Sequence, residues 1–213
     1  MTYTHLFFDL DETLYPTNSG LWQLITERIS GYMIERMHLE PAIVPDLRVR
    51  LFKTYGTTFG GLRREYDIDD HDFLDYVHDL PLTDHLQADP TLRQMLQNYP
   101  QEKWVFTNAD AGHAQRIMNV LGIADCFEGI IDILDIDPHS KPKPQAYHTA
   151  LNKAGVDDPI RCVFMDDRHP NLDTARELGF FTIQVGAHPQ GEVQHPRIPV
   201  ITDLPKILSQ QQK

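Results

Sequence analysis

The sequence is poor in cysteine and has no long apolar run. Only Cys126 and Cys162 are present, each beside apolar neighbours, so we expect two reduced, buried thiols rather than a disulfide framework. No stretch approaches the roughly eighteen consecutive apolar residues of a membrane span, and the N-terminus lacks the features of a secretion signal. These absences favour a cytoplasmic protein without a membrane anchor.

Positive charge is also scarce. The chain has 19 lysine and arginine residues against 31 aspartate and glutamate residues, a formal net charge of −12. Proteins that bind nucleic-acid polymers do so by displacing counterions with lysine and arginine, so this charge argues against such a partner. A small anion is a better candidate ligand, but its site must carry a local cation, either a metal ion or a well-placed lysine.

Short apolar runs that end in polar residues recur along the 213-residue chain and predict buried parallel strands. The runs lie at residues 6–8, 103–106, 129–134, 162–165 and 182–185. Helical patterns separate them at residues 91–98, 111–121, 144–154 and 171–178. The alternation predicts an α/β fold with a doubly wound parallel sheet, in which ligands bind beyond the carboxyl ends of the strands.

One segment, residues 15–85, shows several helical patterns and no convincing strand. It enters directly after the first strand, so we expect a helical cap domain above that strand's carboxyl end, with residues 1–14 and 86–213 forming the core domain. His71, His78 and His85 recur in it at every seventh residue beside acidic neighbours. We expect these histidines on a solvated helix face rather than at a zinc site.

Asp9 and Asp11 follow the first apolar run and are two residues apart, so on extended backbone both side chains point roughly the same way. Such a pair can divide the labour of phosphoryl transfer. One ionised carboxylate attacks phosphorus, and the other, with its pKa raised by the like charge, protonates the leaving oxygen and later deprotonates water. The pattern also occurs in ordinary turns, so it needs support from the other strand ends.

Two later strand ends supply that support. Thr107 and Asn108 offer a hydroxyl and backbone donors for phosphate oxygens, although the pair is also a common turn opener. Lys141 lies in a proline-stiffened loop, where it can keep the nucleophile ionised and neutralise phosphate. Lys143, in the same loop, is the rival candidate, and spacing alone does not choose between them.

Asp166 and Asp167 end the apolar run at residues 162–165. Two adjacent carboxylates at a buried strand end are costly unless a cation or hydrogen bonds compensate them, although one of the two can be explained as a helix cap. Oxygen ligands from Asp9, the Asp11 region and Asp167, with Asp166 beside them, suit Mg²⁺. We therefore expect magnesium as the cofactor.

These residues resemble the haloacid dehalogenase superfamily, whose four motifs match residues 8–13, 106–108, 141–144 and 165–167. The resemblance implies a Rossmann-like core and identifies Asp9 as the nucleophile. It implies that Asp11 is the acid/base and binds the metal through its main-chain carbonyl, that Thr107 binds phosphate, and that Lys141 is the motif lysine. Asp167 becomes the main acidic metal ligand.

By the same resemblance, Asp166 lies beside Asp167 or behind it, with Asn171 as a supporting polar residue. The second aspartate of the first motif, Asp11, is generally missing from the dehalogenases that name the superfamily. Its presence favours phosphatase chemistry over halide displacement, because a leaving alkoxide needs a proton.

The segment 55–69, together with residues 14–16, is similar to the pyrimidine 5′-nucleotidase branch of subfamily I. That resemblance implies nucleoside monophosphate substrates and suggests four cap residues that reach the nucleoside: Tyr55, Thr57, Thr58 and Arg63. Other small phosphometabolites, such as sugar phosphates or phosphoglycolate, and a phosphomutase remain alternatives. A receiver-type signalling module is a non-enzyme alternative, but receivers carry the phospho-acceptor on the third strand and lack so large a helical insertion.

Overall fold

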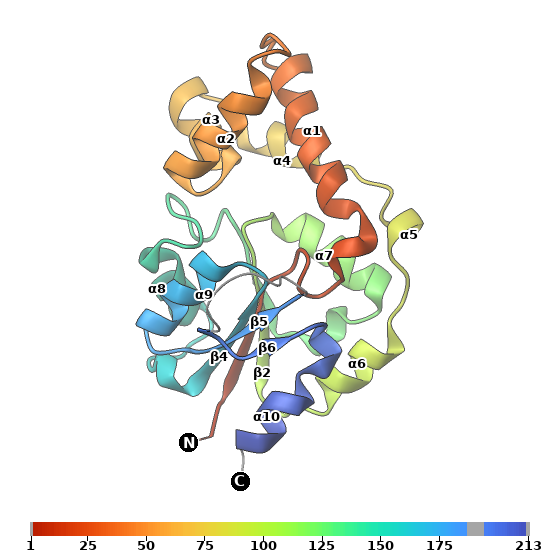
Figure 1. Ribbon diagram of the computed structural model, residues 1–213, viewed down its shortest axis with the longest axis vertical. Helices are drawn as coiled ribbons and strands as arrows, with labels where there is room; N and C mark the ends of the chain where they lie inside the picture. The colour runs from red at the N-terminus through yellow and green to blue at the C-terminus, as the bar shows by residue number, and fades with distance from the viewer. Residues whose placement is uncertain (1, 187–193, 212–213) are drawn as a thin grey trace.

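A computed structural model describes residues 2–186 and 194–211. Within these residues, parallel strands form one six-stranded sheet in the order β3-β2-β1-β4-β5-β6 (Figure 1). The strands are β1 (His5–Phe8), β2 (Glu102–Phe106), β3 (Gly129–Ile131), β4 (Cys162–Asp166), β5 (Phe181–Val185) and β6 (Arg197–Ile198). The chain builds outward from β1 to β3 and then returns to the other side of β1 for β4 to β6. This confirms the doubly wound α/β fold expected from the alternation of strands and helices.

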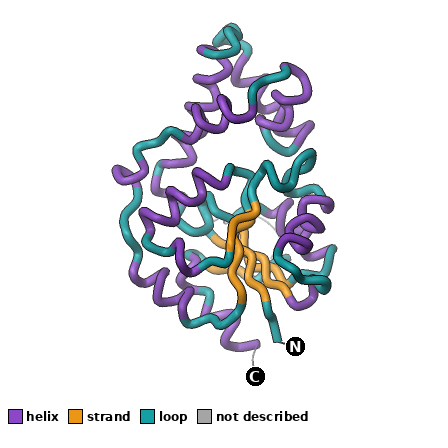
Figure 2. The backbone as a smooth tube through the Cα atoms, turned by 180° about the vertical axis from the view of Figure 1, so that it is seen from behind, coloured by secondary structure: helices purple, strands orange, loops and turns teal. Residues whose placement is uncertain are grey.

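Helices cover both faces of the sheet (Figures 1 and 2). Because side chains alternate along a strand, Phe7 packs on one face while Leu6 and Phe8 pack on the other. The Phe7 face is covered by α8 (Pro144–Lys153) and α9 (His169–Glu177). The opposite face is covered by α6 (Pro90–Gln97), α7 (Ala111–Leu121) and α10 (Pro205–Gln211).

A group of helices between β1 and β2 stands above the carboxyl ends of the strands (Figure 1). It comprises the short turn η1 (Thr17–Ser19), α1 (Leu21–Glu35), α2 (Val44–Tyr55), α3 (Thr58–Tyr66) and α4 (Asp70–His78), and α5 (Leu82–His85) lies in the return connection. Buried aromatic rings hold the group together: Phe73 stacks on Phe59 at 5.1 Å between centroids and meets Tyr32 edge-on at 5.0 Å. We refer to α1–α4 as the cap.

The α2–α3 turn of the cap comes close to the core. Gly56 ends α2 with a φ of +89°, which favours glycine, and a Cβ atom there would lie 3.0 Å from Oγ of Ser140. Thr57 then begins α3, since its hydroxyl accepts a hydrogen bond from the backbone N–H of Gly60 at 2.9 Å. The cap therefore approaches the core at the loop that carries Lys141.

The structure differs from the expected elements in several places. β3 is shorter than predicted, because the Asp132 carboxylate accepts backbone N–H groups of Leu134 and Asp135 and turns the chain. β6 and α10 were not predicted, because β6 has only two residues and neither segment gave a recognisable periodic pattern.

The structure bears on the expectations for the two cysteines and for a membrane span. Cys126 and Cys162 are free thiols as expected, but only Cys162 is buried, and Cys126 is half-buried. None of the helices in the described part of the chain combines the length and apolarity needed to cross a membrane.

Candidate active site

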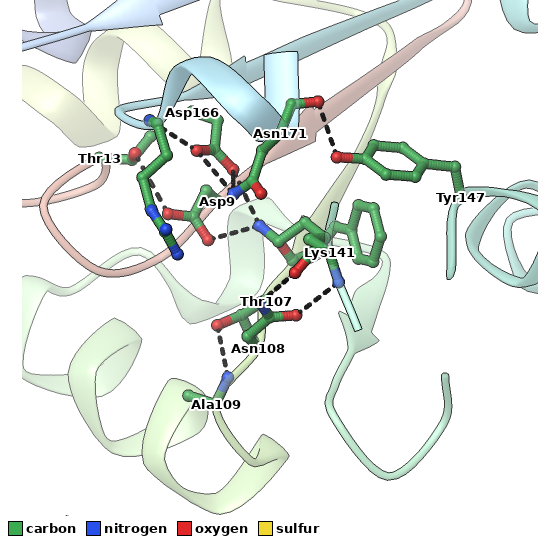
Figure 3. A network of polar contacts seen from close by, with 11 residues as sticks. Asp9, Thr13, Thr107, Asn108, Ala109, Lys141, Tyr147, Asp166 and Asn171 are labelled. Carbon is green, nitrogen blue, oxygen red and sulfur yellow. Dashed lines mark hydrogen bonds and ion pairs between the residues drawn. The ribbon is translucent and has the colours of Figure 1, made fainter. Parts of the chain in front are cut away.

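The carboxyl ends of three neighbouring strands bring polar side chains together. β1 lies between β2 and β4 and pairs in register with both. Asp9 follows β1 directly, and its backbone N–H extends the pairing by donating to the carbonyl of Met165 at 2.8 Å. Thr107 follows β2, and Asp166 is the last residue of β4. These three side chains therefore meet at one edge of the sheet (Figure 3).

Lys141 reaches the centre of this edge. Its Nζ atom lies 2.7 Å from Oδ1 of Asp9, 3.0 Å from Oδ2 of Asp166 and 2.7 Å from the carbonyl oxygen of Phe106. The residue is only 1% exposed, and three acceptors match the three N–H bonds of its ammonium group. Burial alone would lower the pKa of Lys141, but the Asp166 and Asp9 carboxylates raise it above its ordinary value. The lysine is therefore charged beside Asp9.

The side chain of Asn108 fixes the loop that carries this lysine. Its Oδ1 accepts the backbone N–H of Lys141 at 2.9 Å, and its Nδ2 donates to the Lys141 carbonyl at 3.0 Å. Lys143, in contrast, is exposed and lies at the N-cap of α8. Of the two candidate lysines, Lys141 is the one in contact with Asp9.

Hydrogen bonds within the protein limit which groups of Thr107 and Asn108 can donate to phosphate. The backbone N–H of Thr107 is engaged by the carbonyl of Ile131 at 3.0 Å, so only its hydroxyl remains to donate. The Thr107 hydroxyl oxygen already accepts the N–H of Ala109 at 3.0 Å. Because the Asn108 side chain is occupied by Lys141, its backbone amide is the group left for phosphate.

Asp166 is completely buried and saturated with donors. Both of its oxygens accept Nδ2 of Asn171, at 3.0 and 2.9 Å, and Oδ1 also accepts the backbone N–H of Arg168 at 2.8 Å. With Lys141 on Oδ2, this carboxylate is arranged to hold the lysine and the start of α9. Asn171 is fixed in turn, because its carbonyl accepts the hydroxyl of Tyr147 at 2.7 Å (Figure 3).

Asp9, Asp166 and Asp167 present carboxylate oxygens that all lie within 4.8 Å of one another. Burial raises the pKa of Asp9 to about 7, with Lys141 opposing the shift and Asp166 adding to it. Burial and the charges of Asp9 and Asp166 raise the pKa of Asp167 to about 8. Crowded, poorly solvated carboxylates of this kind are relieved by a hard divalent cation, so the donor set fits Mg²⁺.

The environment of Asp11 differs from the expectation. Its Oδ1 accepts the hydroxyl of Tyr15 at 2.6 Å and lies 3.4 Å from Nε2 of His113. Burial raises the pKa of Asp11, but the contacts with His113 and Tyr15 outweigh it, so that its pKa is lowered. The predicted increase from the like charge of Asp9 was wrong, because the sequence does not show these two donors.

Three of the four cap candidates lie near the loop at residues 137–143. Tyr55, Thr57 and Arg63 line a cavity of about 360 Å³ between cap and core, while Thr58 is buried and does not line it. Arg63 bridges the two parts, because it pairs with Asp70 of the cap at 2.7 Å and with Asp137 of the core. The cavity also reaches Ser140 and Lys143 but not Asp9, so it lies beside the carboxylates rather than around them.

The expectation of a solvated histidine face was wrong for His78. This residue is 5% exposed, stacks on His113 and contacts Asp110, whereas His71 is exposed and His85 is half-buried. The contacts of Tyr15 and His113 with Asp11, and of Asp110 with His78, were not predicted from the sequence. No spacing rule identifies them, because the contact of Tyr15 depends on the turn after β1 and the contacts of His78, Asp110 and His113 depend on how α4, α7 and that turn pack together.

The chain is similar to several known proteins. A family model described as haloacid dehalogenase-like hydrolase matches residues 3–179. Phosphate metabolism protein 8 of Saccharomyces cerevisiae is 30% identical over 189 residues, which cover 81% of this chain and 58% of the yeast protein. The chain therefore spans a little over half the length of that relative.

Solved structures with the same fold include enzymes of different chemistry. The HAD phosphatase of Thermococcus onnurineus has a TM-score of 0.66 at 15% identity, covering 98% of both chains. The L-2-haloacid dehalogenase of Xanthobacter autotrophicus has a TM-score of 0.63 at 16% identity, covering 98% of this chain and 99% of the other. At these identities the likeness concerns the fold alone. The family match over most of the chain carries the assignment: this protein belongs to the haloacid dehalogenase-like hydrolases.

Proposed function

We propose that this protein hydrolyses phosphomonoesters with Asp9 as a covalent nucleophile, and that nucleoside 5′-monophosphates, notably those of pyrimidines, are its substrates. The observation that carries the proposal is the contact of Nζ of Lys141 with Oδ1 of Asp9 at 2.7 Å, beside the carboxylates of Asp166 and Asp167. An ionised aspartate held by a buried lysine is suited to attack phosphorus.

In the first step, a carboxylate oxygen of Asp9 attacks phosphorus in line with the ester oxygen. The bond from phosphorus to that oxygen breaks, and Asp11 gives the leaving oxygen a proton. Asp11 must take up this proton before the step, because its contacts with His113 and Tyr15 lower its pKa and favour the ionised form. Lys141 and the hydroxyl of Thr107 stabilise negative charge on the transferred group. The products of this step are the alcohol and an aspartyl phosphate.

In the second step, Asp11, now ionised, takes a proton from water as the water oxygen attacks phosphorus of the aspartyl phosphate. The bond from phosphorus to Asp9 breaks, and inorganic phosphate leaves. Asp9 and Asp167 would hold Mg²⁺, with the Asp11 main-chain carbonyl as a further ligand. When bound, this ion supplies positive charge that neutralises the phosphate oxygens.

The substrate class rests on the cap. The chain resembles the pyrimidine 5′-nucleotidase branch in the cap segment that contributes Tyr55, Thr57 and Arg63 to the cavity. The cavity volume of about 360 Å³ falls within the usual range for small-molecule sites. The name of the yeast relative, phosphate metabolism protein 8, agrees with phosphate chemistry but specifies no substrate.

The substrate assignment predicts a ranking of activities. Phosphate release is measured for pyrimidine and purine monophosphates, sugar phosphates and phosphoglycolate, each with Mg²⁺ and with a chelator. We expect pyrimidine monophosphates to give the highest kcat/KM and the chelator to abolish release. If sugar phosphates or phosphoglycolate rank first, the nucleotidase assignment is wrong and the phosphatase assignment stands; isomerisation of a sugar phosphate without phosphate release would indicate a phosphomutase.

Metal binding should depend on pH. The pKa values of about 7 for Asp9 and about 8 for Asp167 mean that protons compete with Mg²⁺ for both carboxylates below pH 8. We expect the apparent affinity for Mg²⁺ to rise at least about tenfold between pH 6 and pH 8. Isothermal titration at several pH values measures it, and an affinity independent of pH would contradict the assigned ligands.

The same groups should affect stability with a defined sign. Their folded-state pKa values exceed those of the unfolded chain, so the metal-free fold loses stability as pH rises from about 4 to about 8. Mg²⁺ binding offsets this loss, and its stabilising effect on the melting temperature should be larger at pH 8 than at pH 6. Comparing the difference with and without Mg²⁺ at each pH cancels the contribution of His78, whose pKa is lowered by burial.

A further inference from the structure

A second polar cluster joins the end of the cap to Asp11. We call it the histidine cluster, and it consists of His78, Asp110 and His113. The two imidazole rings are stacked, with centroids 4.1 Å apart and planes inclined by 17°. Asp110 holds both residues: its Oδ1 accepts the backbone N–H of His113 at 2.9 Å, and its Oδ2 contacts Nδ1 of His78. The two rings are therefore held in one arrangement.

His78 is also fixed through its backbone. Its carbonyl accepts a hydrogen bond from Nη2 of Arg116 at 3.1 Å. Arg116 lies about one turn after His113 in α7. The last residue of α4 is thus attached to the first turns of α7 by a side-chain contact and a backbone contact. This attachment gives the ring of His113 a flat, immobile partner on one face.

Core packing alone does not explain a histidine at position 113. It is 0% exposed, and its Nδ1 has no hydrogen-bond partner within residues 2–186 and 194–211. A buried polar atom without a partner is destabilising, and leucine or phenylalanine would fill the space without one. The other ring nitrogen, Nε2, lies 3.4 Å from Oδ1 of Asp11. The polar function of this imidazole is therefore directed at Asp11.

Tyr15 makes the second contact with the same carboxylate oxygen. Its hydroxyl donates to Oδ1 of Asp11 at 2.6 Å, while Nε2 of His113 approaches that oxygen from α7. Two donors on one oxygen restrict rotation of the carboxyl group and leave Oδ2 to exchange a proton with a substrate. Proton transfer requires hydrogen-bond distance, so a carboxyl group free to rotate would be a poorer acid.

We propose that His113, held by the stacked ring of His78 and by Asp110, is a positioning residue that orients Asp11 for proton transfer to the leaving oxygen. It does not touch the substrate and acts only through Asp11. The inference rests on the proposed function, because it concerns the acid of that reaction. It predicts that the need for His113 grows with the basicity of the leaving group.

The test compares two substitutions on two substrates. His113→Phe keeps a flat ring for stacking on His78 but removes the donor, whereas His113→Gln places an amide N–H near the position of Nε2. The substrates are p-nitrophenyl phosphate, whose leaving group needs little protonation, and the alkyl monoester hydrolysed fastest in the panel above. The quantity is kcat/KM, because it reports steps up to departure of the leaving group and excludes later hydrolysis of the aspartyl phosphate.

We expect His113→Phe to lower kcat/KM for the alkyl ester at least about tenfold and for p-nitrophenyl phosphate less than about threefold. His113→Gln should recover most of the loss. The matched control is His85→Phe in the return connection, where the imidazole contacts the carbonyl of Ser19, and this variant should retain both activities. Equal losses on both substrates, or no loss, would overturn the inference.

Two further outcomes distinguish failure of the inference from failure of the proposed function. A wild-type protein that releases no phosphate from either ester overturns the proposed function and the inference together, whereas an active wild type with equal losses overturns the inference alone. If His113→Phe does not fold, as judged by circular dichroism, the comparison of His113→Gln with His113→Asn replaces it. The shorter amide of asparagine does not reach Asp11, so the same selective loss is expected for His113→Asn.

Discussion

Replacing Asp9 with asparagine should abolish phosphate release while the protein remains folded. An amide nitrogen or a neutral amide oxygen does not form the phosphoenzyme, so we expect kcat to fall by at least about 10⁴-fold for every substrate. The fold should tolerate the change, because burial already raises the pKa of Asp9 to about 7 and the amide has nearly the same shape. Phosphate release and a thermal melt measure the two effects separately.

The control for this prediction is Asp157→Asn, which makes the same chemical change at an exposed residue on the loop before β4. It should leave both activity and melting temperature unchanged. A rapid-quench experiment with a ³²P-labelled substrate should also show an acid-stable phosphoprotein in the wild type and none in Asp9→Asn. Near-normal turnover by Asp9→Asn would rule out the nucleophile assignment.

Replacing Lys141 with methionine should remove both activity and much of the stability. The ammonium group contacts Asp9 and Asp166 at 2.7 and 3.0 Å, and Asp166 is 0% exposed. Removing one partner of a buried ion pair leaves an uncompensated charge, which costs about 3–5 kcal/mol. We therefore expect a loss of that size in the free energy of unfolding measured with urea.

Lys143→Met is the matched control, because this lysine lies two residues away and is exposed. Its effect on stability should be below about 0.5 kcal/mol. Adding Asp166→Asn to Lys141→Met should restore part of the lost stability, since it removes a stranded carboxylate, and a double-mutant cycle measures the coupling. If Lys143→Met is as harmful as Lys141→Met, the choice between the two lysines is wrong.

The sheet was predictable because its strands are short, strongly apolar and end in polar residues. Asp9, Thr107 and Asp166 follow or end such runs, and the parallel order brings their positions to one edge of the sheet. The convergence of these residues follows from the general geometry of doubly wound sheets and needs no knowledge of side-chain contacts. The helices between β1 and β2 were recognisable for the opposite reason, since helical patterns continued along that segment without a strand.

The choice between Lys141 and Lys143 was beyond the sequence because it depends on loop conformation. Asn108 fixes that conformation through two hydrogen bonds to the backbone of Lys141, a pairing of residues 33 positions apart. The histidine cluster was not predictable for the same reason. His78 belongs to a heptad pattern typical of a solvated helix face, but α4 packs against α7 and the ring of His78 stacks on His113. Isolated polar residues whose partners are distant in the sequence leave no periodic signal.

The direction of the pKa shift of Asp11 could not be predicted from the sequence for a similar reason. The sequence shows the neighbouring charge of Asp9, which raises a pKa, but not the degree of burial or the donors that lower it. Tyr15 is close in the chain, yet the contact requires a particular turn after β1, and His113 comes from a different helix. A sequence therefore shows that two charged groups are neighbours, but it does not show whether the pKa of either group is raised or lowered.

The central place of β1 has a consequence for the durability of the site. Leu6, Phe7 and Phe8 are all 0% exposed, and the strand is hydrogen-bonded on both edges, with the amide of Asp9 continuing that bonding to Met165. Segments of this kind exchange their amide hydrogens only when the whole molecule opens, unlike chain ends or surface loops. The backbone of Asp9, the proposed nucleophile, should thus belong to the most slowly exchanging part of the protein, and its geometry should survive partial opening elsewhere.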